Sequence, residues 1–219
     1  MTEPKSITKN QIVEYYINDA LEGSNSLKSV FAFAKKYTIT ESDFYDHFAS
    51  FEALEKSVFA SFCTETIKLL LKNDDYHHYN SNTKLLSFYF TFFELLTANR
   101  SFVFLKLKSN ANKLESLKLL SGLRKEFITY LSTQVYINET DLKNKSLNEL
   151  RDKGVSEATW LQLLFTLQFW LEDESKGFEK TDIFIEKSVK ASFDLKDITP
   201  VKSVFDFAKF LWNEKRGSV

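Results

Sequence analysis

Apolar residues recur at helical spacing along most of the chain. The segment 201–212 is a clear example, because an apolar residue falls on one side of a helix at every third or fourth position. Residues that interrupt helices are rare, since the 219 residues include 5 glycines and 2 prolines. The pattern therefore predicts an all-α protein with about nine to eleven helices.

Capping residues predict where the first two helices begin. Thr8 and Gln11 have the spacing of a capping box, which opens a helix that ends at Gly23. Asn25 or Ser26 is in the right place to cap a second helix, whose apolar positions then follow helical spacing.

The segment 37–59 predicts a turn, a short helix and then a long helix. Thr40 is the expected cap of the third helix, 41–48, with Asp43 as its capping-box partner. A fourth helix begins after Ser50 and carries apolar residues along one side.

The rest of the chain divides into further apolar-periodic segments separated by polar ones. Residues 85–96 are apolar almost all round, as in a helix buried in the middle of a domain. The expected elements are a polar break at 73–82, a short helix at 100–109, a long helix at 113–135 with a bend at Ser121–Gly122, a polar loop containing a short helix at 138–154, a helix capped by Ser156, a helix at 178–193, and a last helix that starts at Thr199–Pro200.

Composition and charge exclude several classes of function. The net charge of −1 gives no overall attraction to nucleic acid or membranes, although residues 100–125 hold seven basic residues and one acid. Cys63 is the only cysteine, and neither a signal segment nor a membrane span is evident, so we expect a cytoplasmic protein. No phosphate-binding loop, nucleophile–base pair or metal-ligand spacing is present, and Asp74 to His78 reads as a solvated loop. We therefore expect no catalytic residues, no metal and no cofactor.

The segment 29–59 resembles the N-terminal DNA-binding module of TetR-type transcriptional regulators. The resemblance is carried by the Ile39–Thr40 turn, the run Phe44-Tyr45-Asp46-His47-Phe48, and the Glu52-Ala53-Leu54 start of the next helix. It implies a three-helix helix–turn–helix domain at 1–52 and a helical bundle for ligand binding and dimerisation at 53–219. It also implies contacts to double-stranded DNA from six residues: Lys28, Thr40, Ser42, Tyr45, His47 and Lys56.

Three features depart from the usual TetR pattern. The helix that would enter the DNA groove, 41–48, carries three acids and no Lys or Arg. Family members usually have Gly in the turn where this chain has Thr38, and Lys where it has Phe51. Between residues 27 and 59 there are four lysines and five acids, a net charge of −1, so the phosphate attraction that normally dominates DNA affinity is reduced.

The same resemblance implies a ligand pocket and a homodimer in the C-terminal part. A hydrophobic ligand would be enclosed by aromatic residues, for which the candidates are Phe88, Tyr89, Phe92, Phe93, Phe102 and Phe104. The alternative is that these rings form an ordinary packed core. The helix from residue 156 is apolar on two sides and therefore needs two partners, so the expected dimer interface is Trp160, Leu163, Leu167, Trp170 and Phe184.

A second resemblance leads to an alternative function. Trp170, Asp173, Ser175, Thr181 and Phe184 are spaced as in the C-terminal signature of lipid-binding proteins of ubiquinone biosynthesis. Those proteins share the TetR fold but are not DNA readers. The sequence thus supports two hypotheses: a ligand-controlled TetR-like regulator, and a lipid or isoprenoid binder that has kept the fold without DNA contact.

Overall fold

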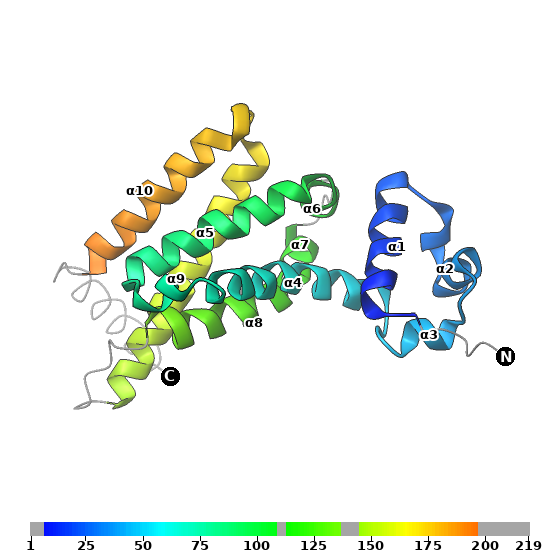
Figure 1. Ribbon diagram of the computed structural model, residues 1–219, viewed down its shortest axis with the longest axis horizontal. Coiled ribbons are helices and arrows are strands. Elements are labelled where there is room, and N and C mark those ends of the chain that lie inside the picture. The colour runs from blue at the N-terminus through cyan, green and yellow to red at the C-terminus, as the bar shows by residue number, and fades with distance from the viewer. Residues whose placement is uncertain (1–6, 109–112, 137–144, 197–219) are drawn as a thin grey trace, which may run out of the picture.

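The computed structural model describes residues 7–108, 113–136 and 145–196, and within these ranges the chain is all-α (Figure 1). Its ten α-helices agree with the predicted fold class. They are α1 (Lys9–Glu22), α2 (Val30–Tyr37), α3 (Glu41–Tyr45), α4 (Phe51–Leu71), α5 (Ser81–Ala98), α6 (Arg100–Leu107), α7 (Lys113–Leu119), α8 (Ser121–Tyr130), α9 (Lys145–Glu172) and α10 (Glu179–Lys196). Short 3₁₀ turns lie at Asn25–Lys28, Asp74–His78 and Lys176–Phe178, and a π-helical turn, Leu131–Val135, extends α8.

The helices form two parts joined by α4 (Figure 1). We call residues 7–52, which contain α1, α2, α3 and the first residues of α4, the head. The remaining described residues are the body. From the head, α4 continues into the body, where it packs against α8 and α5, while α9 and α10 complete the bundle. One further contact joins the two parts, because α1 of the head packs against α6 of the body.

Local capping explains most helix boundaries in the head. Thr8 and Gln11 form the predicted capping box, and α1 ends at Gly23, whose φ of 64° is left-handed. The second helix begins later than predicted, at Val30, with Ser29 as its cap. Ser26 is unavailable as a cap because its hydroxyl donates a hydrogen bond to the buried carboxylate of Asp19.

Two expectations about the segment before Trp160 are wrong, namely the cap at Ser156 and the largely loop structure before it. Ser156 does not cap a helix but lies inside α9, which already begins at Lys145. The polar stretch before it is rich in Lys, Leu, Glu and Arg, which favour helix, so polarity alone did not indicate a loop. The predicted last helix from Thr199 lies outside the described residues.

The break predicted at Ser121–Gly122 is found at Leu120, between α7 and α8. Gly122 itself serves close packing rather than bending. A Cβ atom built on it would lie 3.0 Å from the carbonyl oxygen of Lys56 and 3.1 Å from the Cβ of Ala60. The missing side chain therefore lets α8 approach the backbone of α4.

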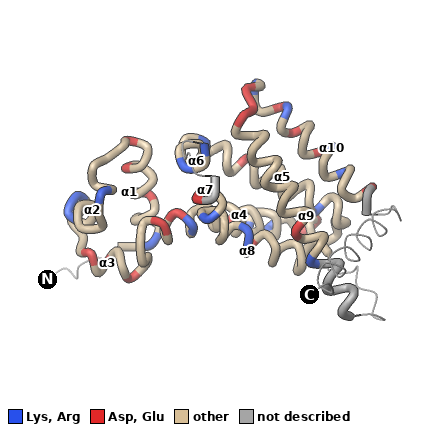
Figure 2. The backbone as a smooth tube through the Cα atoms, turned by 180° about the vertical axis from the view of Figure 1, so that it is seen from behind, with Lys and Arg blue, Asp and Glu red and all other residues tan. Residues whose placement is uncertain are grey.

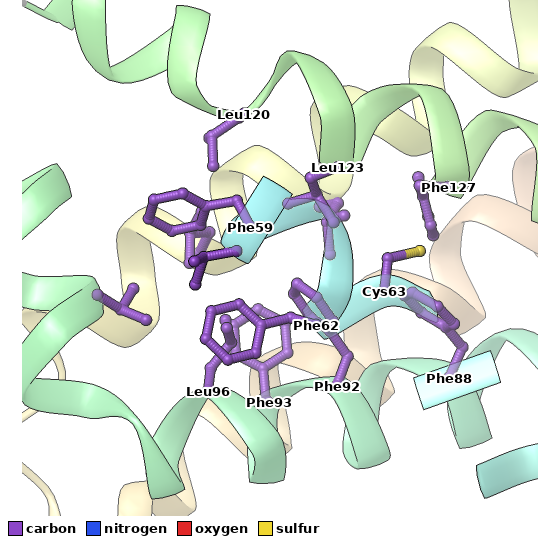
Figure 3. Packing of buried hydrophobic residues seen from close by; sticks show 14 of the residues in the cluster. Phe59, Phe62, Cys63, Phe88, Phe92, Phe93, Leu96, Leu120, Leu123 and Phe127 are labelled. Atoms are coloured by element: carbon purple, nitrogen blue, oxygen red, sulfur yellow. The ribbon is translucent and has the colours of Figure 1, made fainter. Parts of the chain in front are cut away.

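The body is built around aromatic side chains. Figure 3 shows Phe59, Phe62 and Cys63 of α4 packed between the rings of α5 on one side and Leu120, Leu123 and Phe127, at the start of α8 and within it, on the other. Cys63 is fully buried, and burial raises the pKa of its thiol. Tyr76 departs from the predicted solvated loop, because its ring is buried and its hydroxyl lies 2.6 Å from that of Tyr130.

The turn between α2 and α3 depends on a strained residue. Thr38 has φ 54° and ψ 42°, the left-handed conformation that glycine adopts without cost. Its backbone N–H and that of Ile39 both donate to the carbonyl of Ala34, which ends α2. The geometry expected of a glycine is thus kept by a β-branched residue, at a cost of about 1–2 kcal/mol.

We therefore predict that Thr38→Gly stabilises the protein. Removing Cβ relieves the left-handed strain, and we expect a gain of about 1 kcal/mol in the free energy of unfolding after the larger chain entropy of Gly is subtracted. Thermal denaturation followed by circular dichroism measures the change. Lys35→Gly is the control, because Lys35 is an exposed residue within α2, and its free energy of unfolding should fall by about 1 kcal/mol. A lower free energy of unfolding for Thr38→Gly as well would contradict the proposed strain at Thr38.

Candidate functional site

Four of the residues predicted to contact DNA, namely Thr40, Ser42, Tyr45 and His47, lie in α3 or directly beside it. Ser42 and Tyr45 are exposed, and the Tyr45 side chain keeps about half of its surface in solvent (52%). His47 is also exposed, but its Nε2 lies 3.0 Å from the carbonyl oxygen of Ile7. The Thr40 hydroxyl is engaged in the capping box, where it donates to Asp43 and accepts from the Asp43 N–H. Ser42 and Tyr45 are therefore the predicted residues whose polar groups are open to a partner.

The lysines of this region are divided between free and paired side chains. Lys28 and Lys35 are exposed. Lys36 Nζ lies 2.5 Å from a carboxylate oxygen of Asp19, and Lys56 Nζ lies 2.6 Å from one of Glu52. Of the two predicted phosphate ligands, Lys28 is thus available, whereas Lys56 is neutralised within its own helix.

The acids of α3 have two different roles. Asp43 completes the predicted capping box, and hydrogen bonds from the backbone and side chain of Thr40 hold its pKa below the ordinary value. Glu41 and Asp46 are exposed and take part in no ion pair within the described residues. Figure 2 shows basic residues on α2 and acidic residues around α3. One half of the surface that would face DNA therefore repels phosphate.

Phe51, where TetR regulators usually have lysine, belongs to the core of the head. Its ring centroid lies 5.3 Å from those of Tyr16 and Phe44 and 5.6 Å from that of Phe33. The three contacts join α1, α2 and α3 to the start of α4. The aromatic ring thus stabilises the head by packing while it removes a potential phosphate ligand.

A buried carboxylate that sequence reasoning missed fixes α2 against α1. Asp19 is fully buried and accepts hydrogen bonds from Ser26, from Lys36 at 2.5 Å and from Tyr37 at 2.7 Å. Burial alone would raise the pKa of Asp19, but the bonds from these donors, that of Lys36 above all, hold it below its ordinary value. The charge of Lys36 therefore serves the fold of the head.

A second cluster of polar side chains joins head and body. Lys106 of α6 places its Nζ 2.6 Å from a carboxylate oxygen of Glu55 on α4 and 2.9 Å from the hydroxyl of Tyr16 on α1. The Tyr16 hydroxyl in turn donates to Glu55. Burial, followed by the bond to Glu55, raises the pKa of Tyr16, so the hydroxyl stays protonated as a donor. We call these three residues the clasp.

The aromatic residues predicted to enclose a ligand mostly pack against one another. Phe88, Tyr89, Phe92, Phe93 and Phe102 are buried, and the rings of Phe88 and Phe92 stack with centroids 5.5 Å apart. The structure thus gives these five the packing of a core, which was the alternative interpretation. Phe104 is the exception, since 37% of its surface is exposed on α6.

The residues predicted for the dimer interface lie on two different faces. Trp160, Leu163, Leu167 and Trp170 are buried in the body of the same chain, so these four side chains do not face a partner. Phe184 differs, because it lines a surface groove. The helical spacing of apolar residues predicted for α9 is confirmed. The more apolar of its two stripes, however, packs into the body of the same chain.

The outer face of α9 and α10 is apolar and unusually exposed. Leu161, Phe165 and Ile183 keep 52%, 64% and 50% of their surface in solvent. Beside them lies an open groove of about 460 Å³, where the rings of Phe169 and Phe184 stack at 4.8 Å. We call this surface the outer face. Its exposed apolar side chains lie next to Lys180 and Lys187, which also line the groove.

Comparison with known proteins agrees with this architecture. The profile of the tetracyclin repressor-like C-terminal domain matches residues 84–211, which is more than half of the chain. The chain belongs to the TetR family. Members of this family regulate transcription. No protein of curated function shows a significant match to the sequence.

In this TetR protein, the residues that resemble the ubiquinone-related signature build a turn. Asp173 accepts hydrogen bonds from the backbone and hydroxyl of Ser175 and from the backbone and hydroxyl of Thr181, all between 2.6 and 2.9 Å. Burial opposes these bonds, yet together they lower the pKa of Asp173 to about 2. The turn from α9 to α10 accounts for the spacing of these residues without any lipid.

The described part of the TetR chain offers no other centre of chemistry. Within it, no three His, Cys, Asp or Glu side chains come together as metal ligands do, and His77 and His78 are exposed. No helix in these ranges is long and apolar enough to cross a membrane. Among the places where polar groups join separate elements, the Asp19 cluster and the clasp are the two described here that involve residues of the head.

Proposed function

We propose that this TetR protein is a dimeric transcriptional regulator that binds double-stranded DNA through α2 and α3, with an affinity that a ligand controls. The observation that carries the proposal is the turn at Thr38, which keeps a left-handed backbone despite its strain. That turn presents Ser42 and Tyr45 at the surface of α3, where base and phosphate contacts are made in this type of module.

The charge distribution limits how steeply DNA binding can depend on salt. Lys28 and Lys35 are the exposed lysines near the turn, whereas Lys36 and Lys56 are paired with carboxylates. A dimer would then bring about four phosphate-neutralising lysines to DNA. Because log K falls with log [salt] by about 0.9 per neutralised phosphate, we expect a slope no steeper than about −4.

We predict specific binding to the DNA upstream of its own gene, measured by fluorescence polarisation between low and physiological salt. Lys28→Ala should weaken binding on every sequence and make the slope shallower by about 2, because one phosphate contact is lost from each of the two subunits. Lys68→Ala is the matched control, since Lys68 is an exposed lysine of α4 in the body.

Absence of binding at micromolar protein and low salt would contradict the proposal. It would favour the second candidate, a TetR-fold protein that binds a hydrophobic ligand and no longer contacts DNA. The observations that favour this candidate are the aromatic role of Phe51 and the exposed acids Glu41 and Asp46. The Asp173 turn does not support it, because that turn has a structural explanation.

We propose the outer face as the dimer interface. Leu161 and Phe165 are one helical turn apart on α9, and Ile183 and Phe184 continue the apolar surface on α10. Two copies that meet through this face would form a symmetric contact between two pairs of helices. A stable dimer needs about 1,200–2,000 Å² of total buried surface, which a pair of long helices from each subunit can supply.

We predict that Phe165→Glu converts the dimer to a monomer, because the substitution places two carboxylates in an apolar interface. Light scattering coupled to size-exclusion chromatography measures the mass. Phe31→Glu is the matched control, since Phe31 is equally exposed (62%) but lies on α2 of the head, and this variant should remain dimeric. A monomeric wild-type protein at tens of micromolar would refute the interface.

A further inference from the structure

The strongest unassigned feature is a crevice between the head and the body. It has a volume of about 430 Å³ and is lined by Leu21 of α1 and by Arg100, Ser101, Phe104 and Leu105 of α6. Pockets for small ligands measure about 300–1,000 Å³, so the crevice has room for a small molecule. It is separate from the aromatic core of α5, whose rings fill the space where a ligand was first expected.

The long walls of the crevice are apolar. Leu21 and Phe104 keep 47% and 37% of their surface exposed, although they face each other from two packed helices. Leu105 adds an aliphatic side chain that is only partly buried. An apolar ligand body inserted here would remove these surfaces from water, which is favourable at about 25 cal/mol per Å².

Arg100, which lines the crevice, interacts electrostatically with Asp173 but forms no ion pair within the described residues. The Arg100 guanidinium donates to the carbonyl oxygens of Trp170 at 3.0 Å and Leu171 at 3.4 Å. The rings of Trp170 and Phe178 also lie close to the guanidinium, each with its centroid 4.4 Å from Cζ. Within the described residues no carboxylate lies within 4.0 Å of it, and three of its five N–H groups make no hydrogen bond.

A second cation lies near the crevice. Residues 100–108 hold three basic residues, of which Lys106 is paired with Glu55 in the clasp, leaving Arg100 and Lys108. Lys108 places its Nζ over the ring of Phe104, 4.8 Å from the centroid, so a second cation borders the apolar wall. The exposed hydroxyl of Ser101 stands next to Arg100. Apolar walls that end at a guanidinium, a hydroxyl and an ammonium are complementary to a molecule with an apolar body and an anionic group.

We propose that the crevice between α1 and α6 binds an amphipathic organic anion. Its carboxylate would accept hydrogen bonds from Arg100 and Ser101, and its hydrocarbon part would lie between Leu21, Phe104 and Leu105. The walls belong to both head and body, and Lys106 of the clasp follows Leu105 directly. Occupation therefore acts on the contact between α1 and α6, and its effect on DNA affinity rests on the function proposed above.

The test is binding of sodium octanoate to the full-length protein by isothermal titration calorimetry. We expect one saturable site per chain, and at least tenfold weaker binding of octylammonium and octan-1-ol, which share the chain length but lack the negative charge. We expect octanoate to bind with a dissociation constant of about 1 mM. Equal binding of the three compounds would overturn the proposal, and so would the absence of octanoate binding at a concentration about 5-fold above that constant.

Two variants locate the site without removing Arg100, which also supports α9. Ser101→Glu sets a carboxylate beside the anion, and Phe104→Ser removes the apolar wall; each should weaken octanoate binding at least tenfold. Ile183→Ser on the outer face is the control and should bind octanoate normally. Unchanged binding in both crevice variants, or equal loss in the control, would refute the site. These titrations contain no DNA, so their outcome is independent of whether the head reads DNA.

Discussion

The clasp is the interaction on which the geometry of the molecule depends. Lys106 and Glu55 keep only 18% and 15% of their side-chain surface in solvent, and the hydroxyl of Tyr16 is bonded to both. Each member comes from a different helix, so the three positions define how α1, α4 and α6 meet. Removing one partner of such a pair leaves an uncompensated buried charge, which typically costs about 3–5 kcal/mol. The head is thus held in one orientation by a polar contact that tolerates little displacement.

The head itself combines an intact scaffold with an altered surface. Phe51, the Asp19 cluster and the strained turn at Thr38 keep three short helices in place, while the exposed acids Glu41 and Asp46 oppose phosphate. Specificity in such a module would come from side chains that read base edges rather than from nonspecific attraction. A regulator of this kind would distinguish DNA sequences but bind nonspecific DNA weakly. A protein that no longer contacts DNA would need the three-helix scaffold of the head but not the exposed side chains on α3.

The sequence predicted those features that depend on neighbouring residues. The capping boxes at Thr8 and Thr40 follow from local spacing, and both are present. The start of α9 was missed because its first residues are mostly polar, although the Lys, Leu, Glu and Arg among them favour helix. The dimer face was assigned to the more apolar stripe through Trp160, although α9 is apolar on two sides and only tertiary packing decides which one turns inward. The clasp joins residues up to 90 positions apart, and no local pattern indicates it.

The most direct test of this account is a double-mutant cycle across the clasp. Lys106→Met and Glu55→Gln remove the charges with little change of shape, and thermal denaturation gives the free energy of unfolding of the wild type, both single variants and the pair. We expect each single variant to lose at least about 2 kcal/mol and the pair to lose less than their sum, with a coupling of about 1–3 kcal/mol. Losses that add within about 0.5 kcal/mol would show that the two charges do not act together, and would contradict the claim that the clasp holds the head on the body.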